Sequence, residues 1–145
     1  MQTSHAIKET LPDGRMQFSS DNCRFVFQRL RPGALLVTVS GLDSGQFGTA
    51  ALDEFRMELL RYYPLEILVD ARDAIGVAVE VSRDWTRFFS ENRQRLKRVS
   101  VLAGSKMVQL TVEIAQHLSH TGNLIQIYSD VDLFDEAVAR ARMAN

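Results

Sequence analysis

Residues 65–73 read Leu-Glu-Ile-Leu-Val-Asp-Ala-Arg-Asp, so an apolar strand core runs directly into three charged residues. Residues 65–69 are almost all apolar, which is typical of a strand buried on both faces of a parallel sheet. A glycine shortly afterwards indicates a loop. Functional groups gather at the carboxyl ends of parallel strands. We therefore expect a functional site at Asp70, Arg72, Asp73 and Gly76.

The rest of the chain alternates between the periodicities of strands and helices. Further strands are predicted at 23–30, 35–40, 99–103 and 124–128, and helices at 47–62, 82–96, 104–122 and 130–141. Strands that alternate with helices require right-handed crossovers. We therefore expect a single α/β domain with a mixed, mostly parallel sheet, about four helices and a leading β-hairpin. On the third helix, the spacing places the inner face at Leu110, Thr111, Ile114 and Leu118.

Length and charge indicate one domain with no global attraction to nucleic acid. The chain has 145 residues, which is enough to form one hydrophobic core. Its net charge of −1 at pH 7 gives it no overall attraction to a polyanion. Residues 1–14 are polar and end in Pro-Asp-Gly, so we expect a tail and then a domain at 15–145. Cys23 is the only cysteine, the start shows no signal pattern, and no apolar run reaches about 20 residues. These features predict a cytoplasmic protein.

This order of elements, in which the strand that ends at Asp70 feeds a loop and a helix, resembles the STAS domain. STAS domains include bacterial anti-sigma factor antagonists and the tails of sulfate transporters. The segments 98–104 and 125–137 are most similar to the lipid-pocket-related branch of the family, which also resembles the CRAL-TRIO fold. The resemblance extends from about Arg24 to Arg142 and is carried by pattern and topology. It implies a regulatory, non-catalytic role.

The resemblance also draws attention to one departure from the family. In its antagonists, an Asp at the end of this strand is closely followed by a phosphorylatable Ser and glycines. Asp70 stands at the matching end, but Ala71 and Arg72 follow it. A phosphate adds up to about two negative charges that repel a partner surface, and a site without a hydroxyl cannot use that switch. Ser82 is either a substitute acceptor or, as its position favours, the N-cap of the next helix.

The leading hypothesis is a cytoplasmic regulatory module that binds a protein partner and catalyses no reaction. Charged residues at strand ends are exposed by geometry, and the predicted surface comprises Asp70, Arg72, Asp73, Gly76 and Ser82. No nucleophile–base arrangement accompanies these carboxylates, which argues against an acid–base site. Homodimerisation is a further expectation, because residues 24–30 have the pattern of an edge strand. We predict no cofactor.

Three aromatic residues support the main alternative. Trp85, Phe88 and Phe89 are grouped on one predicted helix. They form either a plain core stripe, which is the commoner arrangement, or the lining of a pocket for a small apolar ligand. The alternative function is therefore a carrier of such a ligand, for example a lipid, as in the lipid-binding relatives.

A third hypothesis rests on the glycine-spaced loop from Gly41 to Gly48. The loop follows a strand and precedes a helix, which is the setting of a phosphate-binding loop in a nucleotide-binding enzyme. Its spacing matches neither the dinucleotide nor the P-loop pattern, and Asp70 lies 29 residues after Gly41 rather than about 20. The favoured interpretation is that these glycines only permit the turns of the loop.

Two polar clusters complete the sequence evidence. Glu113, His117 and His120 share one helix face, but no second group of ligands accompanies them, so we predict no metal site. A basic cluster comprises Arg93, Arg95, Lys97 and Arg98. A solvated helix face is the favoured interpretation of this cluster, and contact with a membrane surface is the alternative.

Overall fold

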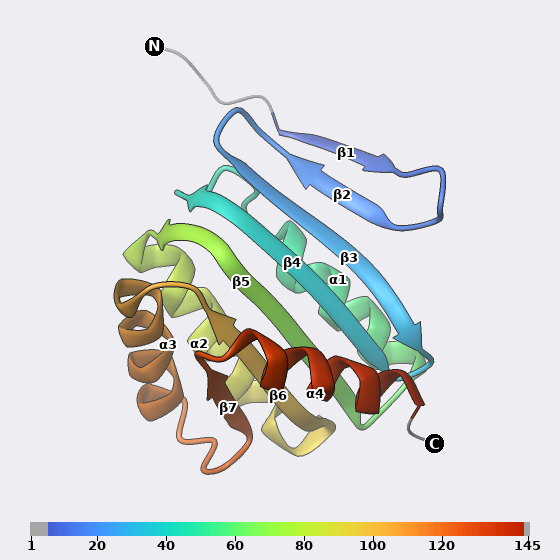
Figure 1. The fold of residues 1–145 in the computed structure, drawn as a ribbon, viewed down its shortest axis with the longest axis vertical. Coiled ribbons are helices and arrows are strands. Elements are labelled where there is room, and N and C mark those ends of the chain that lie inside the picture. The colour runs from blue at the N-terminus through green and yellow to red at the C-terminus, as the bar shows by residue number, and fades with distance from the viewer. Residues whose placement is uncertain (1–5, 144–145) are drawn as a thin grey trace.

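Within residues 6–143, which the computed structural model describes, seven strands form one sheet in which each strand lies beside its neighbours in sequence (Figure 1). The elements are β1 (Ile7–Thr10), β2 (Met16–Ser19), β3 (Cys23–Arg31), β4 (Ala34–Asp43), α1 (Ala50–Arg61), β5 (Leu65–Val77), α2 (Val79–Asn92), the 3₁₀ turn η1 (Arg93–Arg95), β6 (Leu96–Ala103), α3 (Lys106–Leu118), β7 (Ile125–Tyr128) and α4 (Val131–Met143). β1 to β4 pair antiparallel, and β4 to β7 pair parallel. The predicted mixed sheet with four α-helices is confirmed.

Helices cover both faces of the parallel half of the sheet. α1, α2 and α3 each connect neighbouring parallel strands, and right-handed crossovers place all three on one face. α4 follows β7 and crosses the opposite face (Figure 1), where it contacts β3, β4, β6 and β7. The parallel strands are therefore sandwiched between two helical layers, while β1 and β2 extend the sheet beyond them.

β5 is buried on both faces, as its run of apolar residues predicted. Leu65, Ile67 and Val69 belong to the larger core, beneath α1, α2 and α3. Leu68 belongs to a second, smaller core, where it packs with Phe134 of α4. Alternate residues of a strand point to opposite faces, so this division places Asp70 on the α4 face.

An aromatic cluster holds α1 and α2 against the sheet. The ring of Phe55 on α1 lies 5.7 Å from the ring of Phe27 on β3, 5.7 Å from Phe88 and 5.5 Å from Trp85, both on α2. Aromatic pairs in such geometries contribute roughly 0.5–1.5 kcal/mol each beyond the area that they bury. Phe55 and Phe88 are fully buried. The cluster fixes the position of α2, which carries one wall of the candidate site.

Residues 7–10, which were expected to belong to a tail, form a strand. Ile7–Thr10 forms β1 and pairs with β2 across the turn at 11–15, where Gly14 donates to the carbonyl of Leu11 at 2.9 Å. Residues 1–5 lie outside the described part of the chain. The strand was missed because all four of its residues are exposed, so it has none of the apolar alternation that identifies a half-buried strand.

The expected edge at residues 24–30 is wrong. β3 pairs with β2 on one side and with β4 on the other, so its backbone groups are already used in the sheet. A strand in this position offers no free hydrogen-bonding edge to a second copy of the chain. In the described residues the edges are β1 and β7, and the sequence argument for a homodimer no longer has a basis.

The loop expected at residues 70–76 is also wrong. β5 continues to Val77, because β4 runs on beside it to Asp43 and supplies ladder partners along its whole length. α2 then begins at Val79, with Ala78 in the N-cap position and no side chain capping it. Ser82 therefore lies inside the first turns of α2 and is not its N-cap.

A β-bulge interrupts the extended part of β5. Thr38 of β4 pairs with Asp70, and Ser40 pairs with Asp73, so β5 has one more residue than β4 between these pairs. A bulge bends its strand and redirects the side chains. Arg72 and Asp73 are consecutive and both exposed, between two buried alanines. The bulge thus presents two charged side chains in a row to solvent.

The inner face of α3 differs from the prediction. Its buried residues are Val108 and Ala115, whereas Leu110, Ile114 and Leu118 are 57%, 48% and 57% exposed. The helix has apolar residues on two sides, and either stripe satisfies helical periodicity. The stripe of smaller residues faces the sheet, and the larger side chains are left in solvent.

Candidate functional site

The charged residues of β5 form a cluster with α4. The guanidinium of Arg72 contacts the carboxylate of Asp70 at 2.9 Å and that of Asp135 on α4 at 3.3 Å. Asp70 also accepts the backbone N–H of Arg72 at 3.2 Å. The hydrogen bond that Arg72 donates to Asp70, supported by the charges of Asp70 and Asp135, raises the pKa of Arg72. The charge of Arg72 is therefore balanced within the fold, and the contact ties β5 to α4.

The five residues of the predicted partner surface do not form one patch. Asp70 and Arg72 belong to the α4 side of the sheet, and Asp73 is exposed beside them on the bulge. Ser82 lies on α2, which covers the other face of the sheet. Gly76 is near the end of β5, between these two regions. The sheet itself separates the two halves of the predicted surface.

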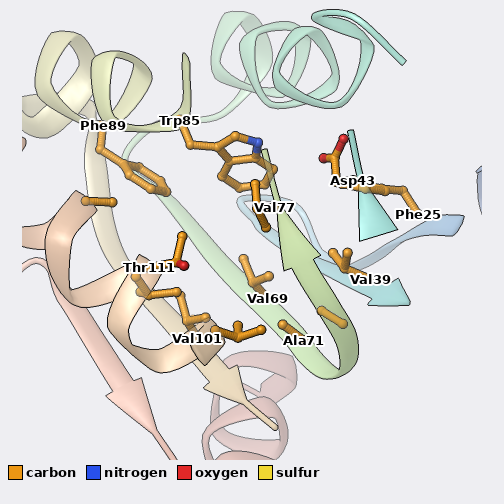
Figure 2. Close-up of a pocket in the computed structure, with 14 residues that line it drawn as sticks. Phe25, Val39, Asp43, Val69, Ala71, Val77, Trp85, Phe89, Val101 and Thr111 are labelled. Atoms are coloured by element: carbon orange, nitrogen blue, oxygen red, sulfur yellow. The ribbon is translucent and has the colours of Figure 1, made fainter. Parts of the chain in front are cut away.

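An apolar cavity of about 90 Å³ lies between the sheet, α2 and α3 (Figure 2). Trp85 and Phe89 line it, whereas Phe88 is packed in the core against Phe55. The residues that line the cavity are Phe25, Val39, Asp43, Val69, Ala71, Ala74, Val77, Trp85, Phe89, Val101, Val108, Thr111, Val112 and Ala115. Among these, only Asp43 carries a formal charge.

Asp43 is an unusual component of such a wall. It is the last residue of β4, and only 6% of it is exposed. One carboxylate oxygen, Oδ1, accepts the backbone N–H of Gly45 at 3.1 Å, and no donor from residues 6–143 bonds to the other oxygen. Burial raises the pKa of Asp43, although the hydrogen bond from Gly45 opposes this effect. Asp43 thus uses one carboxylate oxygen to hold the turn at Gly45, beside an otherwise apolar lining.

Cys23 lies near this carboxylate but is not an activated nucleophile. It is buried, and desolvation together with the charge of Asp43 raises the pKa of its thiol to about 12. Nucleophilic cysteines require a lowered pKa, because the thiolate is the reactive form. Cys23 therefore acts as a small apolar residue of the core.

A groove runs along the outer side of this region, between α2 and α3. It has a volume of about 630 Å³ and is lined by Val77, Val79, Ser82, Arg83, Thr86, Arg87, Ser90, Glu91, Thr111, Ile114 and Leu118. Val79, Ile114 and Leu118 are large apolar residues that remain 61%, 48% and 57% exposed. Val77 and Thr111 line both the groove and the apolar cavity, so the two spaces adjoin.

The basic cluster is distributed among structural contacts. Arg93 donates to the carbonyl of His120 at 3.2 Å, and Arg95 donates to that of Leu59 at 3.1 Å. Arg98 lies 3.7 Å from the buried carboxylate of Glu66. These residues belong to η1 and β6, so the expected helix face is wrong. No helix within residues 6–143 is long and apolar enough to span a bilayer.

In the loop from Gly41 to Gly48, the backbone amides of Ser44, Gly45 and Gly48 already have acceptors within the protein. Ser44 donates to the side chain of Gln46 at 2.8 Å, Gly45 donates to Asp43, and Gly48 donates to the carbonyl of Gly45 at 3.0 Å. A phosphate cradle requires such N–H groups to be free. The geometry therefore gives no support to the nucleotide-binding hypothesis.

The three residues weighed as metal ligands, Glu113, His117 and His120, do not share one helix face in the structure. α3 ends at Leu118, and His120 has a positive φ of 54° beyond it, so His120 leaves the helix face of Glu113 and His117. Among residues 6–143, no group of three or more His, Cys, Asp and Glu side chains is placed to hold a metal ion.

The fold is similar to two solved structures. One is an uncharacterized protein of the DUF3478 family with a SpoIIAA-like fold from Shewanella loihica PV-4, with a TM-score of 0.55, 12% identity and coverage of 81% of this chain and 94% of that chain. The other is an anti-sigma factor antagonist from Mycobacterium paratuberculosis, with a TM-score of 0.56, 14% identity and coverage of 90% and 99%. No family model and no curated protein match the chain. The protein thus has the SpoIIAA-like, or STAS, fold, and the resemblance drawn from the sequence is confirmed at the level of fold.

Two features of the site escaped the sequence reasoning. Asp43 follows an apolar strand at its carboxyl end, so the rule that singled out Asp70 also applies to it. Asp43 was overlooked because it lies in the glycine-spaced segment, which was interpreted as a loop. The exposed stripe of α3 was missed because it was assigned to the core.

Proposed function

We propose that the protein is a non-catalytic interaction module of the STAS type that binds a helical segment of a partner protein in the α2–α3 groove. The observation that carries this proposal is the exposure of Val79, Ile114 and Leu118 along the groove. Exposed apolar surface that is gathered at one place, rather than scattered, marks interaction sites. The STAS fold of the chain supports a role without catalysis.

The chemistry of the groove specifies the partner. Its apolar side chains suit the apolar face of an amphipathic helix, which is a recurring mode of recognition. Arg83 and Arg87 stand on the α2 side of the groove. Arg87 lies 4.0 Å from Asp84, and Arg83 has no salt bridge within the described residues. The partner helix is therefore expected to carry acidic residues beside its apolar face.

Serine phosphorylation at the usual place does not control this module. The junction between β5 and α2 consists of Val77, Ala78 and Val79, and none of these residues has a hydroxyl group. Without an acceptor, the charge-based switch of the antagonists has no counterpart at this junction. We therefore expect binding in the groove not to depend on phosphorylation at this junction.

Displayed helical peptides test this proposal directly. Two peptide libraries share an apolar Leu/Ile face and differ only in flanking residues, which are Glu in one and Lys in the other. We expect the labelled protein to bind Glu-flanked peptides at least tenfold more tightly than Lys-flanked ones. Ile114→Asp should abolish this binding. The control Leu133→Asp, at a 52% exposed position on α4, should leave it intact.

Two results contradict the proposal. One is that neither library yields binders or that both charge types bind equally. The other is that Ile114→Asp and Leu133→Asp weaken binding to the same extent. Circular dichroism of both variants serves as the control that each substitution leaves the fold in place.

A second candidate function is the binding of a small apolar molecule, and the cavity beside Trp85 favours it. Its volume of about 90 Å³ is well below the ~300–1,000 Å³ of pockets for drug-sized ligands, so a whole lipid does not fit in it. Xenon under pressure should shift the methyl NMR signals of Val69 and Val101, which face the cavity. Leu68, on the α4 face, should be unaffected. Unchanged valine signals contradict this candidate.

A further inference from the structure

We propose that the end of the molecule at the amino ends of β5 and β6 binds the surface of an anionic lipid bilayer. The binding surface, which we name the basic end, comprises Met57, Leu60, Arg61, Tyr63, Arg95 and Lys97. Arg61 and Tyr63 come from the end of α1 and the turn that follows it, and Arg95 and Lys97 come from η1 and the start of β6. The proposal depends neither on the α2–α3 groove nor on the apolar cavity.

Two hollows and the contact between them make the basic end one continuous surface. One hollow is lined in part by Leu60 and Arg95, and the other in part by Arg61, Tyr63 and Lys97. The guanidinium carbon of Arg95 lies 5.5 Å from the centre of the Tyr63 ring, so this pair joins the two hollows. The hydrogen bond from Arg95 to a backbone carbonyl of α1 orients the guanidinium but leaves its positive charge unbalanced.

Neighbouring carboxylates do not neutralise the positive charges of the basic end. Within residues 6–143, Arg61, Arg95 and Lys97 form no salt bridge. Three carboxylates of this region are already paired with other arginines, namely Asp53 with Arg56, Glu58 with Arg29, and Glu66 with both Arg31 and Arg98. Of the carboxylates that line the two hollows, only Glu91 has no salt bridge in the described part of the chain. The basic end therefore keeps a positive charge, although the whole chain is slightly acidic.

The two ends of the sheet differ in charge. At the carboxyl ends of the parallel strands, Asp73 is exposed on the β5 bulge and Asp132 is exposed at the start of α4. The other end of α4 lies near the turn between β3 and β4 (Figure 1), where Arg31 donates to the carbonyl of Ala141 at 2.7 Å and Arg142 is exposed. An anionic surface attracts the basic end and repels the opposite end, so the charge distribution favours a single orientation of the bound protein.

Exposed apolar side chains favour a bilayer over other polyanions as the occupant of this surface. Leu60 is 82% exposed, Tyr63 is 71% exposed and Met57 is 53% exposed. Leu60 and Met57 are three residues apart on α1, so they lie on the same side of the helix. Proteins that bind at a bilayer interface combine such apolar side chains with lysine and arginine, and tyrosine rings suit the depth of the headgroups. A nucleic acid would use the positive charges but leave Leu60 in water.

Sedimentation with lipid vesicles tests the proposal. The full-length protein is mixed either with vesicles of phosphatidylcholine alone or with vesicles in which roughly a third of the lipid is anionic phosphatidylglycerol. We expect at least tenfold tighter binding to the anionic vesicles, and this binding should weaken as the salt concentration rises. A fluorescent DNA duplex under the same conditions should bind far more weakly than the anionic vesicles.

Substitutions at exposed positions locate the binding surface. Each basic residue near an anionic surface contributes about a fivefold factor in affinity, so the double variant Arg61→Gln/Lys97→Gln should bind anionic vesicles at least tenfold more weakly than wild type. The matched control is Arg24→Gln/Lys106→Gln, at exposed positions at the starts of β3 and α3. It changes the net charge equally and should bind as wild type does.

Two single substitutions test the apolar contact and the remaining carboxylate. Leu60→Ser should weaken binding about fivefold, because burial of a leucine side chain is favourable, whereas Leu133→Ser, at a 52% exposed position on α4, should leave it unchanged. Glu91→Gln should strengthen binding about fivefold, because it removes a negative charge beside the basic end. A loss of folded structure cannot produce this gain.

Several outcomes overturn the proposal. They are equal binding to neutral and anionic vesicles, equal affinity of wild type and Arg61→Gln/Lys97→Gln, an equal loss in the matched control, unchanged binding by Leu60→Ser, and no gain from Glu91→Gln. Tight binding of the DNA duplex without binding to vesicles would assign the surface to a nucleic acid instead. Circular dichroism of each variant serves as the control that its fold is retained.

Discussion

Gly104 lies directly against the backbone of Arg72, so closely that a Cβ atom on Gly104 would collide with the Arg72 carbonyl. The contact joins the start of the loop that leads into α3 to the bulge of β5. It places the β6–α3 connection and the charged bulge at the same edge of the sheet. The glycine is therefore required by close packing, since its φ is not in the left-handed region.

This contact predicts a position-specific loss of stability. Gly104→Ala should lower the free energy of unfolding by about 2 kcal/mol or more, because the backbone must move to relieve the overlap, and overpacking typically costs ~1–3 kcal/mol. Gly76→Ala is the matched control. There the added Cβ would meet only the side chain of Leu42, at 3.4 Å. Urea unfolding measures both variants, and equal losses would contradict the close-packing account.

A second prediction concerns the pH dependence of stability. Burial raises the pKa of Asp43 above its ordinary value of 3.8, so the folded chain holds this proton more tightly than the unfolded chain. The resulting stabilisation is complete below pH 3.8 and is lost as the pH rises through the folded-state pKa. At pH 7 the ionised carboxylate of Asp43 therefore lowers the free energy of unfolding.

Asp43→Asn should accordingly raise the free energy of unfolding at pH 7, and the gain over wild type should shrink as the pH falls to about 4. The asparagine keeps an oxygen that accepts the N–H of Gly45. Urea unfolding at the two pH values gives the comparison, with Asp73→Asn as control. A variant that is less stable than wild type at pH 7 would show that Asp43 has a compensating partner in the fold.

A third prediction separates the charged cluster of β5 from partner binding. Arg72 is paired with Asp70 and Asp135, so its role is to connect β5 to α4. A double-mutant cycle of Arg72→Ala and Asp135→Ala should give a coupling of about 0.5 kcal/mol, which is typical of exposed ion pairs. Arg72→Ala should bind Glu-flanked peptides as wild type does. Loss of peptide binding without loss of stability would instead make Arg72 part of the binding surface, as the sequence first indicated.

The sequence was sufficient to predict the fold because its apolar patterns are strong where the sheet is buried. The run at residues 65–69 has core contacts on both sides in the structure, and the alternation of strands and helices leaves few topologies open. Distant solved structures agree with that result. The exposed strand β1 carries no such pattern and was therefore missed.

The site was less predictable, for physical reasons that particular residues illustrate. On α3, the stripe of Val108 and Ala115 and the stripe of Leu110, Ile114 and Leu118 fit a helix equally well, and only packing against the sheet selects between them. The continuation of β5 depends on its partner β4 rather than on its own residues. Tertiary pairing, which no local pattern contains, therefore determined both errors.

The central claim, that a partner helix binds between α2 and α3, is tested most directly by mapping a bound Glu-flanked peptide onto the protein with amide NMR shifts. We expect the largest changes at Val79, Thr86, Ile114 and Leu118, with little change along α4. Changes centred on Asp70, Arg72 and Asp135, with the groove unaffected, would contradict the account.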